Sequence, residues 1–224
     1  MKNFAAGFPG WKIWLLGILI GGVLGGVLSL AIPTRYRAMA VVTVDFNVEN
    51  TWPGNPDNEI FYFLDREARK LEELAWSDDT LMAVTQASGT NAVTLRGGIL
   101  ELSQPKDGGW HFYAYANDPK AAATLAASWA KSFNQQAQRS VVASVALDGA
   151  RKALEKDPAD QTYLARVTDL EAQAKGILPG IEISASQLDN LHVEQQGHPA
   201  WNILGGAMFG LLIALFLRSP NQEN

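Results

Sequence analysis

Two long stretches of the chain contain no charged residue. The first runs over 20 residues from Ile13 to Ile32, and the second over 18 residues from Ala200 to Leu217. An α-helix rises about 1.5 Å per residue, so the stretches reach about 30 and 27 Å, close to the thickness of a bilayer's hydrocarbon core. Trp11 and Trp14 stand at the start of the first stretch and Trp201 at the start of the second, as in an interfacial aromatic belt. The pattern therefore predicts transmembrane helices over 11–33 and 200–217.

Each stretch has an alternative interpretation. The first resembles a cleaved signal peptide, with Ala38-Met39-Ala40 as a small-residue site, but its apolar part exceeds the ~7–15 residues of such signals. Arg35 and Arg37 would also separate that part from the cut. The second could be a buried core helix, but Trp201 and Arg218 at its ends favour a span. We expect both helices to be retained membrane spans.

Short basic flanks set the expected orientation. Lys2, Lys12 and Arg218 lie on the terminal sides of the two stretches, which keeps tails 1–10 and 218–224 in the cytoplasm. The segment 34–199 is then extracytoplasmic, and it holds 15 Lys/Arg against 22 Asp/Glu. This acidic balance argues against nucleic acid as a partner.

Glycines recur at four-residue spacing inside both apolar stretches. Small residues at i and i+4 let two helix backbones approach closely. The alternative is that glycine is simply frequent in membrane helices. We expect helix packing at seven positions: Gly17, Gly21, Gly22, Gly25, Gly26, Gly206 and Gly210. The partner could be the same chain's other helix or a second protomer.

Between the apolar stretches, the periodicity alternates between two and about 3.6 residues. Val42, Val44, Phe46 and Val48 alternate with polar residues and predict a strand. Asn117-Asp118-Pro119 starts a helix that reaches Lys156, about 57 Å long by its rise, before Asp157-Pro158 ends it. The predicted elements are strands over 36–48, 98–103, 110–116 and 181–185, and helices over 59–75, 77–87, 119–156 and 160–175.

This order predicts an α+β fold with a ferredoxin-like β-α-β-β-α-β domain over 34–199, flanked by the two transmembrane helices. A helix of 38 residues cannot bury its far half in such a domain. We therefore expect residues 119–176 to protrude as a long helix with a short helical hairpin.

Candidate chemistry is sparse. The chain has no cysteine, which excludes disulfides and thiolate metal sites. The three histidines, His111, His192 and His198, are far apart in sequence and belong to no metal motif. Glu72-Glu73 and Asp78-Asp79 could form a carboxylate dyad, but a solvated helix face and a helix cap explain them better. We expect no catalytic residue, no metal and no cofactor.

One aromatic strand offers a binding hypothesis. Trp110 and Phe112 share a face that suits core packing, whereas Tyr113 and Tyr115 point to the opposite face. Aromatic faces can stack on sugars. Tyr113 and Tyr115 are therefore candidates for contact with a glycan or with another protein.

The ordered set of elements resembles the polysaccharide co-polymerases, the chain-length determinant family of bacterial membranes. The resemblance covers nearly the whole chain. It lies in the first apolar stretch leading to Tyr36-Arg37-Ala38, the Asn117-Asp118-Pro119 start with alanines from Ala121 to Ala127, and the glycine-rich last stretch. The chain departs from the family in its shorter helical hairpin and in having only His198-Pro199 before the last stretch.

The resemblance implies a non-catalytic scaffold of the bacterial inner membrane. It would form a homo-oligomeric ring, contact membrane lipid, and act with a polysaccharide polymerase to regulate the length of a lipid-linked glycan. Two alternatives stay open. One is an adaptor of an exopolysaccharide export system that works with a separate cytoplasmic tyrosine kinase. The other is an envelope hydrolase or glycosyltransferase, which the missing catalytic constellation disfavours.

Overall fold

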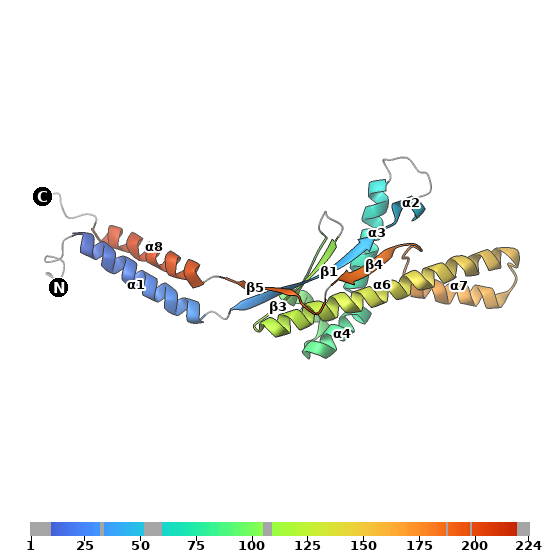
Figure 1. Ribbon diagram of the computed structural model, residues 1–224, viewed down its shortest axis with the longest axis horizontal. Helices are drawn as coiled ribbons and strands as arrows, with labels where there is room; N and C mark the ends of the chain where they lie inside the picture. The colour runs from blue at the N-terminus through green and yellow to red at the C-terminus, as the bar shows by residue number, and fades with distance from the viewer. Residues whose placement is uncertain are drawn as a thin grey trace. The chain divides into compact units, whose positions relative to one another are not determined.

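The computed structural model describes residues 10–31, 34–51, 60–104, 109–186, 188–197 and 199–218. The chain divides into two compact units (Figure 1). The first joins Met1–Arg35 to Gln195–Asn224, and the second is Tyr36–Glu194.

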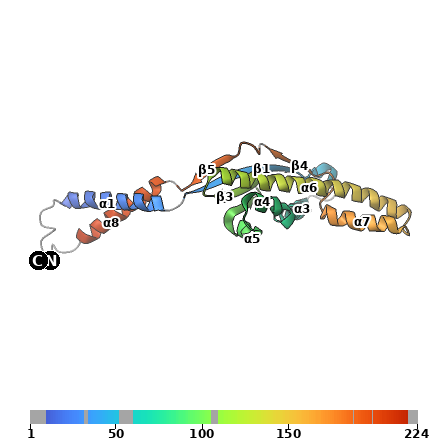
Figure 2. The same cartoon turned by 90° about the horizontal axis from the view of Figure 1, so that it is seen from below.

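The first unit is a pair of helices, α1 (Gly10–Ala31) and α8 (Pro199–Arg218), which pack side by side (Figures 1 and 2). Both correspond in position to the predicted transmembrane helices, but the prediction that they cross a membrane is wrong. Among the described residues, no helix combines the length and the apolar character that crossing a bilayer requires. The fold class with two transmembrane helices is corrected accordingly.

The expected localisation is overturned with them. The bacterial inner membrane, with both termini cytoplasmic and the main domain extracytoplasmic, was predicted from the same two spans. The part of the predicted fold class that the structure supports is the α+β domain between them.

In the described part of the second unit, one sheet has the strand order β2-β3-β1-β4, and β5 also pairs with β1. The strands are β1 (Arg35–Asp45), β2 (Leu100–Ser103), β3 (Gly109–Ala116), β4 (Glu182–Ser186) and β5 (His192–Gln196). The pairs β1–β3, β1–β4 and β2–β3 are antiparallel. This is the order that a β-α-β-β-α-β sequence of elements produces when the third strand inserts between the first two. The strand β5 is a difference, since the sequence pattern predicted no strand after residue 185.

Side chains alternate across the sheet and leave it with one buried and one open face. Along β1, Ala38, Ala40, Val42 and Val44 are buried, and the residues between them are more exposed. The buried face carries Trp110, Phe112 and Ala114 from β3 and packs against the helices. Figure 2 shows α4 and α6 on one side of the strands.

Helices α3 (Ile60–Ala75), α4 (Asp78–Ser88) and α5 (Ala92–Thr94), with the turn η1 (Leu95–Ile99), contribute side chains to the core on the buried face. The one-turn helix α2 (Val48–Thr51) precedes them in the chain. Ser77 caps α4, because its Oγ accepts a hydrogen bond from the Thr80 amide at 3.3 Å. The following turn uses Gly89, whose φ of 66° is left-handed and suits glycine.

An aromatic cluster fills the centre of the main core. Trp129 is fully buried, and its ring meets that of Phe112 edge-on with the ring centroids 4.8 Å apart. The ring centroids of Trp129 and Trp76 are 4.6 Å apart. Its indole N–H donates to the Ala75 carbonyl oxygen at 2.8 Å. The one polar atom of this large side chain is therefore satisfied inside an apolar core.

Helices α6 (Pro119–Lys156) and α7 (Gln161–Ala174) form a helical arm. Helix α6 has the bounds predicted from sequence, and Asp118 caps it by accepting from the Ala121 amide at 2.8 Å. The first half of α6 packs in the main core. The second half packs against α7 through a separate small cluster: Ala143, Leu147, Ala150, Val167 and Ala174.

Candidate functional site

The open face of the sheet carries a polar network that extends over four strands. Because side chains alternate along a strand, the residues facing away from the core come from every second position. We call this set the outer-face network. It consists of Arg37 on β1, Glu101 on β2, His111, Tyr113 and Tyr115 on β3, and His192 and Glu194 on β5.

An ion pair joins β1 to β5 within this network. The Arg37 guanidinium donates to Oε2 of Glu194 at 2.8 Å, and the His192 ring lies 3.2 Å from Oε1 of the same carboxylate. The hydrogen bond from Arg37 holds the pKa of Glu194 below its ordinary value. The same bond raises the pKa of Arg37. The two groups stay oppositely charged at neutral pH.

Arg37 also covers an aromatic ring. Its guanidinium carbon lies 4.9 Å from the centroid of the Tyr113 ring, within the range of a cation–π contact. The His111 ring meets Tyr113 edge-on, with centroids 5.9 Å apart, and its Nδ1 is 3.2 Å from the Tyr113 hydroxyl. One face of Tyr113 is therefore occupied by a neighbour from the protein itself.

Tyr115 connects the other side of the network to β2. It lies opposite Arg37 in the β1–β3 register, and its hydroxyl donates a hydrogen bond to Oε2 of Glu101. Partial burial raises the pKa of Tyr115, and the hydrogen bond to the Glu101 carboxylate adds to the rise. The hydroxyl therefore stays protonated and serves as a donor at neutral pH.

Both tyrosines singled out from the sequence belong to this network. The alternation of β3 was sufficient to place them away from the core. Arg37 was identifiable from the same alternation in β1, but its partner was not. Glu194 is 157 positions away, on the strand that the sequence pattern did not predict.

The predicted packing glycines fall into two groups. A methyl group added at Gly17, Gly21 or Gly25 of α1 would come within 3.0 Å of a backbone oxygen of α8, and the same holds in reverse for Gly206 and Gly210. These five lie where the helices touch. Gly22 and Gly26 lie off this line, because a methyl group there would meet side-chain atoms of α8 at 3.9 and 3.8 Å.

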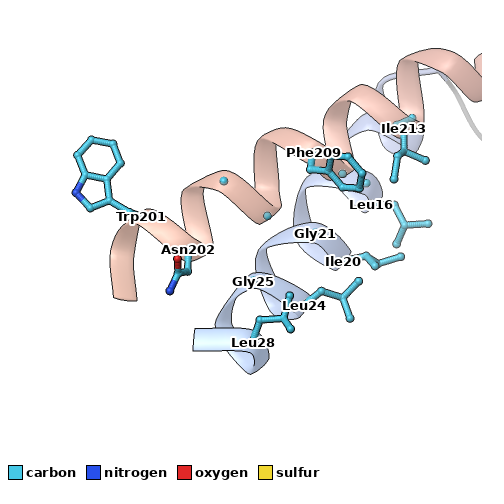
Figure 3. Close-up of a pocket in the computed structure, with 15 residues that line it drawn as sticks. Leu16, Ile20, Gly21, Leu24, Gly25, Leu28, Trp201, Asn202, Phe209 and Ile213 are labelled. Atoms are coloured by element: carbon cyan, nitrogen blue, oxygen red, sulfur yellow. The ribbon is translucent and has the colours of Figure 1, made fainter. Parts of the chain in front are cut away.

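Beside the glycine contacts, an apolar groove of about 740 Å³ runs between α1 and α8 (Figure 3). Leu16, Ile20, Leu24 and Leu28 line it from α1, and Phe209 and Ile213 line it from α8. Asn202 is its polar side chain.

The carboxylates considered for a dyad have other partners. Asp78 pairs with Arg96 at 2.7 Å and Asp79 with Lys175 at 2.8 Å, while Glu72 accepts from Gln104 at 3.2 Å. Among the described residues, no three His, Asp or Glu side chains come together as a metal site. His198 lies outside the described residues.

No protein-family model matches the chain, and no curated protein matches it either. The outer-face network offers hydrogen-bond donors and acceptors in alternation on an open surface, which suits binding.

Proposed function

We propose that the protein is a non-catalytic scaffold that self-associates and regulates the length of a lipid-linked surface polysaccharide. The observation that carries this proposal is the helical arm. Helix α6 has 38 residues, and its second half packs against α7 in a cluster separate from the main core. Such an arm suits a protein that positions partners at a distance. The resemblance to the polysaccharide co-polymerases supports the same function.

The base of the arm is held by two polar contacts. Lys175, at the end of α7, binds Asp79 of α4 at 2.8 Å, and Lys70 of α3 donates to the Gly176 carbonyl at 2.8 Å. Lys70 also bridges both oxygens of Glu67, at 2.8 and 2.9 Å, and Glu67 is fully buried. A buried carboxylate needs such a partner. The contacts favour a fixed arm, which a geometric role in length control requires.

The outer side of the arm offers a surface for self-association. Val142 and Val145 lie one helical turn apart on α6 and are 70% and 56% exposed. Apolar side chains grouped on an exposed helix face are typical of contact surfaces. We propose that copies of the chain associate through this side and that the assembly acts on a polysaccharide polymerase.

The test is the length distribution of the surface polysaccharide. The gene is inactivated in its host and complemented with the wild type, with a Val142→Glu/Val145→Glu variant, or with Val93→Glu. Val93 is 77% exposed on α5 and serves as the matched control. We expect the inactivated strain and the arm variant to lose the modal length on a gel, and Val93→Glu to keep it. An unchanged distribution in the inactivated strain would refute the proposed function.

A further inference from the structure

We propose that the outer-face network binds a neutral saccharide chain. The inference rests on the proposed function and adds to it the place of binding, the class of ligand and the residues that make the contact. It is carried by the arrangement of charged and hydroxyl groups across the four strands, together with the openness of that face.

The groups alternate between acceptors and donors. From β5 to β2, the order is the Glu194 carboxylate, the Arg37 guanidinium, the Tyr115 hydroxyl and the Glu101 carboxylate. The row crosses four strands whose backbones lie ~4.8 Å from their neighbours, so the strands it crosses cover more than the width of one sugar ring. Sugar hydroxyls both donate and accept, and therefore match such a row better than a ligand of one sign does.

The charges of the open face favour a neutral ligand over an anionic one. Arg37 is already paired with Glu194, and Glu101 adds a second carboxylate to the same face. Arg35, two positions before Arg37 on β1, is exposed and adds a second positive charge, so the two arginines balance the two carboxylates. The whole chain has a formal net charge of −5, so an acidic polymer would meet no net attraction here, whereas a neutral chain needs none.

The mode of contact is hydrogen bonding rather than stacking. The Arg37 guanidinium already lies over the Tyr113 ring, and His111 meets that ring at its edge. The carboxylate oxygens of Glu194 and Glu101 retain further acceptor positions, since each carboxylate has about four. Half of the Glu194 side chain is exposed, so its free positions are accessible. The ion pair and the tyrosines thus orient the two carboxylates that contact the sugar.

The experiment measures binding of surface oligosaccharides to the full-length chain by isothermal titration calorimetry. The probe is the oligosaccharide released by mild acid from the surface polysaccharide of the source cells, separated by anion exchange into neutral and acidic fractions. We expect the neutral fraction to bind. Glu194→Gln and Glu101→Gln should each weaken binding about tenfold, because each removes charge-assisted hydrogen bonds.

Asp65→Asn is the matched control. It removes a carboxylate from an exposed pair with Arg69, at 2.7 Å on α3, away from the sheet face. Thermal unfolding verifies that all three variants are folded. Binding confined to the acidic fraction, absence of binding by the wild type, or an equal effect of Asp65→Asn would each overturn the inference.

The two proposals fail separately. If the gene controls polysaccharide length but the neutral fraction does not bind, the sheet face is not the saccharide site and the scaffold function stands. If the neutral fraction binds but inactivation leaves the length unchanged, the chain is a saccharide-binding protein without the proposed role in length control.

Discussion

Lys175 Nζ lies 2.8 Å from Oδ2 of Asp79 and joins the end of α7 to the start of α4, 96 positions earlier in the chain. Lys175 occupies the left-handed position that ends α7, with a φ of 51°. A non-glycine residue is uncommon there. The strained position is thus one where a side-chain contact fixes the arm to the body of the domain.

Removing this ion pair should destabilise the protein slightly and in a pH-dependent way. The hydrogen bond to Lys175 lowers the pKa of Asp79, so the stabilisation is present above its unfolded pKa of about 3.8 and is lost as the pH falls through the lower folded value. Both side chains are partly exposed, which limits the effect of Asp79→Asn at pH 7 to ~0–1 kcal/mol. Urea denaturation at pH 7 and pH 2.5 should show the difference from wild type shrinking at the lower pH. A difference of equal size at both values would contradict this assignment.

Truncating Trp129 should have a far larger effect. Trp129→Ala leaves a cavity beside Phe112 and Trp76 and removes the donor to the Ala75 carbonyl, so we expect a loss of about 3–5 kcal/mol in the free energy of unfolding. Trp129→Phe keeps part of the packing and should lose less. Chemical denaturation measures both. Trp201→Ala is the control, since Trp201 is 69% exposed, and a similar loss there would contradict the central role of Trp129.

The contact between α1 and α8 should distinguish glycines that look alike in sequence. In Gly21→Ala, the new methyl group would collide with the Gly206 carbonyl oxygen, so the helices must separate. Gly205→Ala places its methyl group in open space and should stabilise the helix by up to about 1 kcal/mol. The chain has no cysteine, so spin labels at Leu19→Cys and Leu212→Cys report the helix separation directly. We expect a longer label distance only in Gly21→Ala; equal distances in the two variants would contradict the contact.

The ion pair of the outer face should be visible in the titration of Glu194. The hydrogen bond from Arg37 lowers the pKa of Glu194, and His192 lowers it further. The carboxyl carbon signal of Glu194 in an NMR titration should therefore have its midpoint below the ordinary value of about 4.5. In Arg37→Gln the midpoint should rise. The ion pair stabilises the folded protein above that midpoint, and this stabilisation is lost as the pH falls through it. An unchanged midpoint in Arg37→Gln would exclude the ion pair.

Local signals in the sequence were sufficient for some elements and insufficient for others. Helix α6 was predicted to its ends, because Asp118-Pro119 and Asp157-Pro158 mark a helix start and stop within a few residues. Strand β5 was missed, because its side chains are mostly polar and its pairing with distant β1 decides its conformation. The two apolar helices were located, but the prediction that they cross a membrane was wrong.

The same limit applies to the candidate site. A period of two placed Tyr113 and Tyr115 on the open face, since that depends on neighbouring residues alone. The contact between Arg37 and Glu194 depends on the sheet bringing together residues 157 positions apart, which no local pattern encodes. The arrangement that makes the face a candidate binding surface therefore follows from topology.

The helical arm should unfold locally before the rest of the domain. Its distal core contains few residues, among them Val167, and is separate from the main core around Trp129. Val167→Ala should therefore lower the hydrogen-exchange protection of α7 amides, by about 1–2 kcal/mol of local opening free energy, and leave that of β3 unchanged. Leu164→Ala is the control on the same helix, because Leu164 is 55% exposed and its removal should change protection by less than about 0.5 kcal/mol. If Val167→Ala instead lowered protection in β3 and α7 equally, arm and body would unfold as one unit, and the arm could not be altered in length or surface without affecting the fold of the whole domain.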